Sequence, residues 1–213
     1  MIASRVDFRD DLPPVRQQGR RQTCLAFATS TAHEQRRGSP DALSVEYLFF
    51  HAVARTHGAN PDAGTSMDAA AAALAFDGQP IESVWPYQST QLYVPAWSPP
   101  LVQGGVHRGQ MTVGRLLFAD LCAALDAKRT VVLGLIITDA FRDADSGGML
   151  PTRSLDPERG AHAVLAVGHG AGAAGTHYLL IRNSWGPRWA HNGHAWLSEN
   201  YIERQLHETA IIV

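Results

Sequence analysis

The chain reads Gln18-Gly19-Arg20-Arg21-Gln22-Thr23-Cys24-Leu25-Ala26-Phe27 near its start, a polar segment that runs directly into an apolar helical pattern. Neither Gly nor Pro interrupts that pattern before Gly38, which predicts one helix over 23–37. Cys24 therefore falls in the first helical turn, where the partial positive charge of a helix N-terminus favours a thiolate. Gln18 precedes it by six residues and offers a side-chain amide. The segment predicts an activated thiol.

Two segments far downstream supply the partners that such a thiol needs. Gly160-Ala161-His162-Ala163-Val164 contains a histidine, and Arg182-Asn183-Ser184-Trp185-Gly186 contains an asparagine. A thiol is mostly protonated at neutral pH, so an imidazolium at His162 would be needed to stabilise the thiolate as an ion pair. Asn183 can accept a hydrogen bond from the other ring nitrogen and fix the ring for proton transfer.

Acyl transfer also needs donors to the oxyanion of a tetrahedral intermediate. The side-chain amide of Gln18 and the backbone N–H of Cys24 are the candidates. We expect Trp185 to shield the hydrogen bond between His162 and Asn183 from water. These residues predict nucleophilic catalysis by a cysteine.

The motifs resemble those of the papain (C1) family of cysteine peptidases. Gln18 and Cys24 have the spacing of the family's glutamine and nucleophile, and Ala26-Phe27 repeats the residues that follow the nucleophile. The segment from Ala161 to Gly170 is similar to the family's histidine strand. Further similar segments are Asn183-Ser184-Trp185-Gly186-Pro187-Arg188-Trp189 with Asn192-Gly193, and, as in bacterial members, Gly64-Thr65-Ser66-Met67 and Glu82-Ser83-Val84-Trp85-Pro86-Tyr87.

The resemblance implies an α+β fold of two lobes with the active-site groove between them. Residues 1–105 would form a mainly helical lobe that carries the nucleophile, and residues 106–213 a lobe rich in antiparallel strands that carries the histidine and the asparagine. It implies a peptidase that cuts peptide bonds in peptide or protein substrates through a thioester acyl-enzyme, without a metal or an organic cofactor. The implied catalytic residues are Cys24, His162, Asn183 and Gln18.

The same resemblance implies a set of substrate-binding residues. The backbone around Gly64 and Thr65 would hold the peptide, and Trp185 would lie beside it. The pocket for the second residue before the scissile bond would be bordered by Ser66, Met67, Leu133 and Ala161.

The chain departs from the family pattern around the nucleophile. Leu25 stands where the family usually has tryptophan, and Arg21-Gln22-Thr23 replaces Cys-Gly-Ser, so the family disulfide that starts there is absent. Ala161 replaces an acidic residue or asparagine before the histidine. The segment Val6-Asp7-Phe8-Arg9 resembles the start of a mature enzyme, and we expect no inhibitory pro-segment before it.

Composition restricts the partners and the compartment. The 213 residues are 45% hydrophobic and 18% charged with a formal net charge of -2, which supports neither a nucleic acid nor an anionic membrane as a partner. With two cysteines and no signal-like start, a reducing compartment, the cytoplasm, is expected. No apolar run approaches the roughly 18 residues of a membrane span.

Apolar spacing and capping residues predict the remaining elements. A second helix starts at Ser44 and ends before Gly58, and a third is capped by Thr65 or Ser66 and runs through Phe76. An ordered loop is expected from Val84 to Pro100, with the lobe boundary near Gly104-Gly105. Further expected elements are a helix from Val113 to Lys128 and strands at Val131 to Ile137, Ala163 to Val167, Tyr178 to Ile181, Ala195 to Leu197 and Ala210 to Val213.

Several other polar residues have plain structural explanations. Cys122 lies among leucines on a predicted helix, which favours core packing over chemistry. His177, His191 and His194 have no spacing typical of a metal site and are expected at the surface or in turns. Arg20 and Arg21 either favour acidic substrates or belong to a solvated loop.

The sequence is also compatible with two other functions. A transamidase or a narrow amidase would use the same acyl-enzyme, because motifs do not reveal the acceptor or the substrate. An inactive peptide-binding module would keep the fold without the reaction, although no catalytic residue has been lost.

Overall fold

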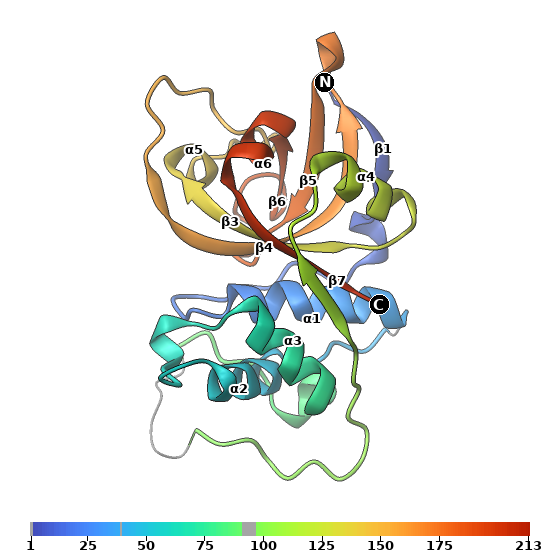
Figure 1. Cartoon of the computed structure of the whole chain (residues 1–213), viewed down its shortest axis with the longest axis vertical. Helices are drawn as coiled ribbons and strands as arrows, with labels where there is room; N and C mark the ends of the chain where they lie inside the picture. Colours follow the sequence, from blue (N-terminus) through green and yellow to red (C-terminus); the bar gives the residue numbers. More distant parts are fainter. Residues whose placement is uncertain (1, 39, 91–96) are drawn as a thin grey trace.

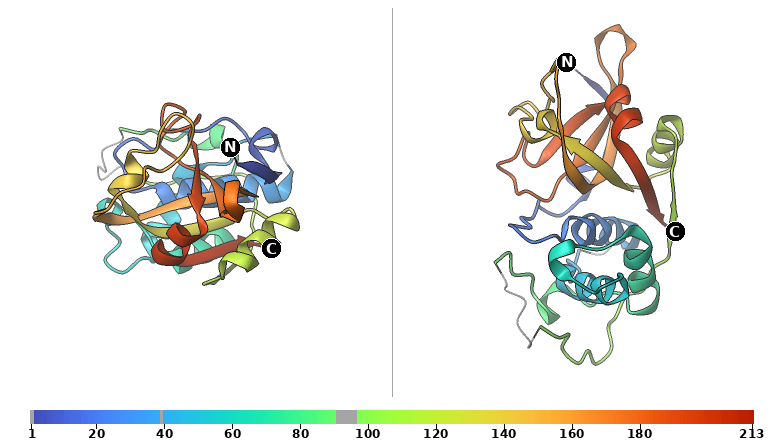
Figure 2. Two further views of the ribbon diagram at one scale, coloured as in Figure 1. Left: turned by 90° about the horizontal axis from the view of Figure 1, so that it is seen from above. Right: turned by 60° about the vertical axis from the view of Figure 1, so that its left-hand side comes forward.

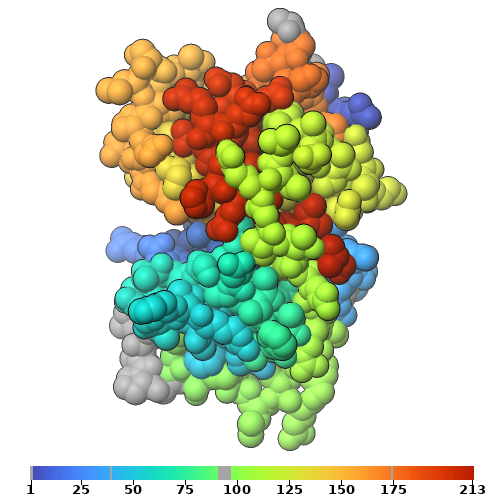
Figure 3. Space-filling view, in the orientation of Figure 1, coloured from blue at the N-terminus to red at the C-terminus, as the bar shows by residue number. Residues whose placement is uncertain are grey.

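The three longest helices and the sheet occupy opposite halves of the molecule. The computed structural model describes residues 2–38, 40–90 and 97–213. Three helices lie together in one half and a seven-stranded antiparallel sheet forms the other, as Figure 1 shows. The space-filling view shows the two halves meeting at a waist, where blue atoms of the N-terminal part of the chain reach the surface (Figure 3). The arrangement confirms the α+β fold class expected from the sequence.

The three helices begin and end close to where the sequence predicts. Ser44 and Ser66 act as N-caps, and their hydroxyls accept hydrogen bonds from the backbone N–H groups of Tyr47 and Ala69. Gly38 ends the first helix with φ +61°, a left-handed conformation that glycine adopts without strain. The helices are α1 (Cys24–Arg37), α2 (Val45–Arg55) and α3 (Met67–Phe76), with short 3-10 helices at Arg9–Asp11, Pro61–Ala63, Glu82–Val84 and Ala173–Gly175.

The sheet is built on two long central strands. Its order is β2-β7-β3-β4-β5-β6, and β1 adds to β4 from outside this path. The strands are β1 (Ala3–Asp7), β2 (Met111–Gly114), β3 (Val131–Thr138), β4 (Glu158–Ala171), β5 (His177–Arg182), β6 (His194–Ser198) and β7 (Leu206–Ile212). The five predicted strands are therefore present, with β4 extended at both ends.

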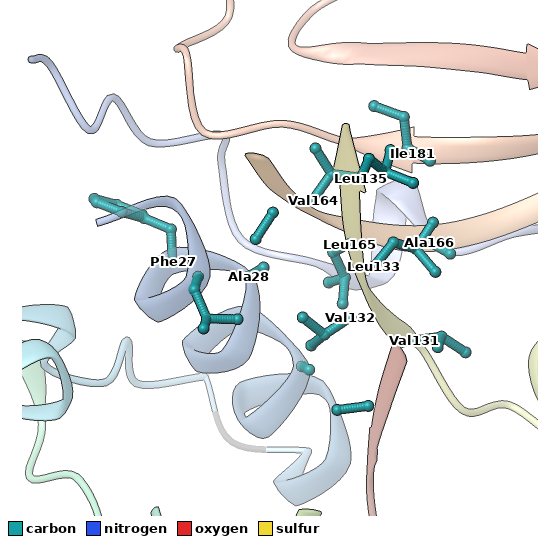
Figure 4. Packing of buried hydrophobic residues seen from close by; sticks show 14 of the residues in the cluster. Phe27, Ala28, Val131, Val132, Leu133, Leu135, Val164, Leu165, Ala166 and Ile181 are labelled. Carbon is teal, nitrogen blue, oxygen red and sulfur yellow. The ribbon is translucent and has the colours of Figure 1, made fainter. Parts of the chain in front are cut away.

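The core lies between α1 and the central strands. Ala28 on α1 faces Val132 and Leu165 of β3 and β4, and all three are buried in one apolar cluster (Figure 4). Phe27 belongs to the same cluster but points away from these strands, with its ring 4.7 Å from that of Tyr87. The sheet twists over α1, as the two further views show (Figure 2). Packing at this seam fixes the N-terminus of α1, and with it Cys24, against the sheet.

The helix expected from Val113 to Lys128 is shorter and is preceded by a strand. Val113 and Gly114 belong to β2, where they pair with Ala210 and Thr209 of β7. The helix α4 spans only Phe118–Asp126. Pairing with a distant strand overrides the local apolar pattern, which cannot distinguish the two conformations over so few residues.

Three further elements were not expected from the sequence. β1 pairs with the far end of β4, so residues 3–7 lie in the sheet half and not with α1, α2 and α3 (Figure 1). The others are the short helices α5 (Asp139–Arg142) and α6 (Glu199–Gln205). The division of the chain near Gly104-Gly105 stays a prediction, and the loop expected from Val84 to Pro100 includes residues 91–96, which lie outside the described residues.

Within the described ranges, no helix has both the length and the apolar character needed to cross a membrane.

Candidate active site

Cys24 is the first residue of α1. Its N-cap is Thr23, and the residue as a whole is partly exposed at the helix start. The N-terminus of α1 points its free N–H groups towards this position, which favours negative charge on the sulfur. The sequence prediction of a thiol in the first helical turn is therefore confirmed.

His162 and Asn183 come from neighbouring strands. His162 lies on β4 and Asn183 follows the last residue of β5, so the pairing of these strands brings them together. The Nε2 atom of His162 is 2.8 Å from Oδ1 of Asn183. The backbone N–H of Ser184 donates to the same oxygen at 2.8 Å, which identifies it as an acceptor, so Nε2 must carry the proton.

Since Nε2 is occupied by Asn183, Nδ1 is the ring nitrogen left for Cys24. Burial raises the pKa of the Cys24 thiol, but the hydrogen bond and the charge of His162 outweigh this effect. Backbone hydrogen bonds from Ala163 and Leu25 act in the same direction as His162. The net result is a pKa below the ordinary value, as nucleophilic attack near neutral pH requires.

The side chain of Gln18 is buried and its amide is held at both ends. Nε2 donates to the backbone oxygen of Arg21 at 2.8 Å, and Oε1 accepts from the hydroxyl of Ser184 at 2.6 Å. The backbone N–H of Gln18 also donates to the oxygen of Ser184 at 2.8 Å. Ser184 thus connects Gln18 to Asn183, a role that the sequence analysis missed although Ser184 stands inside the quoted asparagine motif.

Aromatic rings cover the histidine. The ring of Trp185 lies 4.7 Å from that of His162 between centroids, in the shielding position that the sequence predicts. Phe141 contacts His162, Trp185 and Trp189 at centroid distances of 5.9, 5.6 and 5.1 Å. No local motif marks Phe141, which reaches the site because α5 follows β3 directly.

A cleft of about 150 Å³ lies beside Cys24 and His162. Residues from both halves of the molecule line it, so the site stands where the helices meet the sheet. The lining residues are Gln22, Cys24, Leu25, Ala63, Gly64, Thr65, Met67, Gly134, Leu135, Ile136, Ala161, His162, Ala163, His207 and Glu208.

Four of the expected substrate-binding residues line this cleft, namely Gly64, Thr65, Met67 and Ala161. The other three lie elsewhere. The Ser66 hydroxyl caps α3, and Trp185 packs on the histidine ring outside the lining of the cleft.

Leu133, the third of these residues, is completely buried in the core and does not line the cleft. Side chains alternate along a strand, so its neighbour Gly134 faces the cleft instead. A Cβ at Gly134 would lie 2.9 Å from Cγ of Glu208, which places that carboxylate side chain on the cleft wall. The sequence gives no local signal for Glu208, because it reaches the cleft through pairing of β7 with β3.

Two further expectations need correction. Arg21 is not solvated: it is 6% exposed and forms an ion pair with Glu46, with Nη1 2.6 Å from Oε2. His194 is buried, not at the surface or in a turn, and burial followed by the charge of Arg182 lowers its pKa to about 4. His177 and His191 are exposed as expected.

Cys122 lies on α4 with its side chain half-buried against the core. Burial, and then the charges of Asp126 and Glu199, raise its pKa to about 11. Its surroundings oppose a thiolate, in contrast to those of Cys24.

Comparisons with known proteins agree with this geometry. A cathepsin L-like proteinase of Fasciola hepatica is 27% identical over 205 residues, which are 93% of this chain and 61% of that protein. A cathepsin B-like protein of Giardia intestinalis, CP2, is 27% identical over 200 residues, 88% of this chain and 66% of that protein. The chain thus spans less than two thirds of the length of these relatives.

Solved structures share the fold. Xylellain, a cysteine protease from Xylella fastidiosa, superposes with a TM-score of 0.82 at 24% identity, covering 100% of this chain and 86% of that chain. The Carica candamarcensis protease CMS1MS2, in complex with E-64, superposes with a TM-score of 0.73 at 23% identity, covering 98% and 97%. The family model described as papain family cysteine protease matches residues 2–212, and this chain therefore belongs to the papain family of cysteine proteases.

Proposed function

We propose that this chain is a cysteine peptidase that hydrolyses peptide bonds through a thioester acyl-enzyme. The observation that carries the proposal is the 2.8 Å hydrogen bond from Nε2 of His162 to Asn183, which leaves Nδ1 to the Cys24 thiol. In this role Cys24 is the nucleophile, His162 transfers the proton and Asn183 orients the ring.

In the first step, the Cys24 thiolate attacks the carbonyl carbon of the scissile peptide bond. A carbon–sulfur bond forms and the carbonyl electron pair moves to the oxygen. The Gln18 amide has a second N–H beyond the one given to Arg21, and we assign that N–H and the backbone N–H of Cys24 to the oxyanion. His162 then gives its Nδ1 proton to the amide nitrogen, the carbon–nitrogen bond breaks, and the amine product leaves.

In the second step, water attacks the thioester. Nδ1 of His162, now neutral, takes a proton from the water as the new carbon–oxygen bond forms. Collapse of the second tetrahedral intermediate breaks the carbon–sulfur bond and returns the thiolate, with a carboxylic acid as product. Trp185 and Phe141 cover the ring during both steps, which protects its hydrogen bond to Asn183 from competing water.

The cleft favours an extended peptide as substrate. Gly64 and Thr65 offer backbone groups on one wall. Ala63 and Ile136 are not buried, and they offer apolar surface for a side chain. Glu208 adds a carboxylate to the same cleft, which suits a substrate side chain with a basic end.

The test is cleavage of a diverse peptide library in reducing buffer, with products read by mass spectrometry. Cys24→Ala and Cys122→Ala are a matched pair of variants, because each removes one of the two cysteines. We expect cuts with the wild type and with Cys122→Ala, and none with Cys24→Ala. E-64, the inhibitor bound in the Carica candamarcensis structure, is expected to block the cuts.

An added primary amine separates the alternative reaction. A transamidase would transfer the acyl group to the amine at amine concentrations at which a peptidase still transfers it mainly to water. If amine adducts were the main products, the reaction of this chain would be acyl transfer to an amine and not the proposed hydrolysis. Absence of any turnover together with no labelling of Cys24 would reject both reactions.

A further inference from the structure

The residue three before the nucleophile is a buried arginine. Arg21 donates from Nη1 to Oε2 of Glu46 at 2.6 Å and from Nη2 to Oε1 at 2.7 Å. Glu46 lies in the first turn of α2 and is completely buried. Two parallel hydrogen bonds fix the orientation of the planar guanidinium as well as its position, whereas a single hydrogen bond leaves the group free to rotate.

Further polar groups complete the surroundings of this ion pair. Nε1 of Trp97 donates to Oε1 of Glu46 at 2.8 Å, and Nη1 of Arg21 donates to the backbone oxygen of Gln88 at 2.9 Å. Burying two charges is costly unless hydrogen bonds replace the lost water. Here the hydrogen bonds of Trp97 and Gln88 replace part of that water. The ion pair between Arg21 and Glu46 thus connects the segment before α1 with α2 and with the loop around Gln88.

Tyr87 connects the same arginine to the backbone near the nucleophile. The guanidinium of Arg21 lies 4.9 Å from the centre of the Tyr87 ring. The Tyr87 hydroxyl donates to the backbone oxygen of Gln18 at 2.7 Å and lies 2.8 Å from Oγ1 of Thr23. Both ends of the segment 18–23 are therefore held by one ring, and the middle is held by Arg21.

The backbone oxygen of Arg21 is one of the two groups that hold the Gln18 amide. It accepts from Nε2, while the hydroxyl of Ser184 donates to Oε1. With these two contacts made, the plane of the amide is set, and so is the direction of its second N–H. A shift of the Arg21 backbone would rotate the amide and move that N–H away from the scissile carbonyl.

We propose that Arg21 and Glu46 are positioning residues that hold the Gln18 amide in place for the oxyanion. The proposal rests on the proposed function, since it concerns a donor to the same tetrahedral intermediate. Neither side chain touches the substrate in this role. Their effect passes through the backbone oxygen of Arg21 and reaches the reaction only through Gln18.

The test is a double-mutant cycle with Arg21→Lys and Gln18→Ala. Lysine keeps the charge but cannot make two parallel hydrogen bonds to Glu46. Loss of one oxyanion donor lowers kcat by about 100-fold to 1000-fold, and a displaced donor by less, so we expect Arg21→Lys to lower kcat by about 10-fold to 100-fold. KM is expected to change little. In the Gln18→Ala background, Arg21→Lys should lower kcat no further.

A second readout separates this role from a general loss of structure. Alkylation of Cys24 by iodoacetamide forms no oxyanion, so its rate and pH dependence should be the same in the wild type and in Arg21→Lys. Arg20→Lys is the matched control, because Arg20 is the exposed neighbour and its replacement should leave both kcat and alkylation unchanged.

Additive losses of kcat in the cycle, or a parallel fall in alkylation and turnover, would overturn the proposal. Glu46→Asp is a second variant that keeps both charges and withdraws the carboxylate by one methylene, and the same cycle applies to it. Unfolding of both variants would assign the pair to stability alone and also reject the proposal. A wild type without turnover would instead reject the proposed function.

Discussion

The two cysteines lie in opposite electrostatic surroundings. Cys24 has a histidine and a helix N-terminus beside it, and its pKa is lowered although burial alone would raise it. Cys122 has burial and two carboxylates, and its pKa is raised to about 11. Because only the thiolate reacts, these surroundings favour nucleophilic reactivity at Cys24 and oppose it at Cys122.

This difference predicts selective alkylation. At pH 7, about one Cys122 side chain in 10,000 is a thiolate, given a pKa of about 11. We expect iodoacetamide to label Cys24 rapidly from neutral pH downward into the mildly acidic range, and Cys122 only as the pH approaches 11. Peptide mapping by mass spectrometry after brief labelling measures both rates. His162→Ala should move the labelling of Cys24 to higher pH, and equal labelling of the two cysteines at pH 7 would contradict the assignment.

Glu208 predicts a preference in substrate selection. Its carboxylate lies on the cleft wall, which also includes the partly exposed apolar side chain of Ile136, so a long basic side chain can place its methylenes on apolar surface and its charge near Glu208. Glu208→Gln should lower kcat/KM about 10-fold for substrates with arginine at the selected position and leave those with leucine nearly unchanged. Paired fluorogenic peptides that differ at that one residue measure the ratio. An equal change for both peptides would place Glu208 outside the selecting contact.

Sequence motifs predict the residues of this site well only where the residue carries its own local pattern. Gln18, Cys24, His162 and Asn183 each stand in a recognisable segment, and the structure brings all four together. Glu208 and Gly134 depend on which strand pairs with which and in what register, which a single sequence does not specify. The same limit explains why Leu133 was expected in the cleft.

At the scale of elements, β4 connects the site to the N-terminal strand. Its first half pairs with β3, and its last residues pair with β1, where Gly168 lies opposite Asp7. A Cβ at Gly168 would lie 2.3 Å from the backbone oxygen of Val6. Only glycine allows the two backbones to approach this closely.

Gly168→Ala is therefore expected to destabilise the fold. The added methyl group meets backbone atoms, which cannot rotate away, and overpacking of this kind costs about 1–3 kcal/mol of unfolding free energy. Gly114→Ala is the matched control, because a Cβ at Gly114 in β2 has no atom within 4 Å among the described residues, and its φ is not positive. Urea unfolding measures both changes, and hydrogen exchange should show the loss of protection concentrated in β1. Equal stability of the two variants would contradict the close approach.

The three longest helices could be predicted from the sequence, whereas two short strands could not. Helices α1, α2 and α3 have caps and glycine stops within the sequence, and the structure confirms them within a few residues. β1 and β2 are short strands whose existence depends on distant partners, β4 and β7. At position 21, where the papain family usually has a cysteine and the sequence already excludes a disulfide, the arginine forms an ion pair with Glu46, and no spacing rule reveals that partner.

In the whole molecule, a buried arginine of the sheet holds the chain segment that leads from β1 towards α1. Arg182 at the end of β5 donates to the backbone oxygens of Pro13 and Pro14 at 2.6 and 2.8 Å. Burial lowers its pKa to about 10, so it remains charged at neutral pH. His194 lies beside it on β6 and stays neutral because burial and this charge oppose its protonation.

His194 predicts a loss of stability in acid. Its pKa is about 4 in the folded chain against an ordinary value of 6.5, so between these values the unfolded state binds more protons. Stability therefore falls as the pH falls from 6.5 to 4, by up to about 3 kcal/mol from this residue. Urea unfolding of the wild type and of His194→Gln across this range isolates the contribution as a difference. Parallel curves for the two proteins would show that His194 is not the cause.

The most direct test of the proposed mechanism is to trap the acyl-enzyme. A slowly hydrolysed acyl ester is mixed with the wild type, with Cys24→Ala and with Cys122→Ala, the reaction is stopped with acid, and the intact protein and its peptides are weighed by mass spectrometry. We expect a mass increase of one acyl group on the peptide that contains Cys24, in the wild type and in Cys122→Ala, which disappears as the product forms. Turnover that persists in Cys24→Ala, or an acyl group on any other residue, would contradict the proposed mechanism.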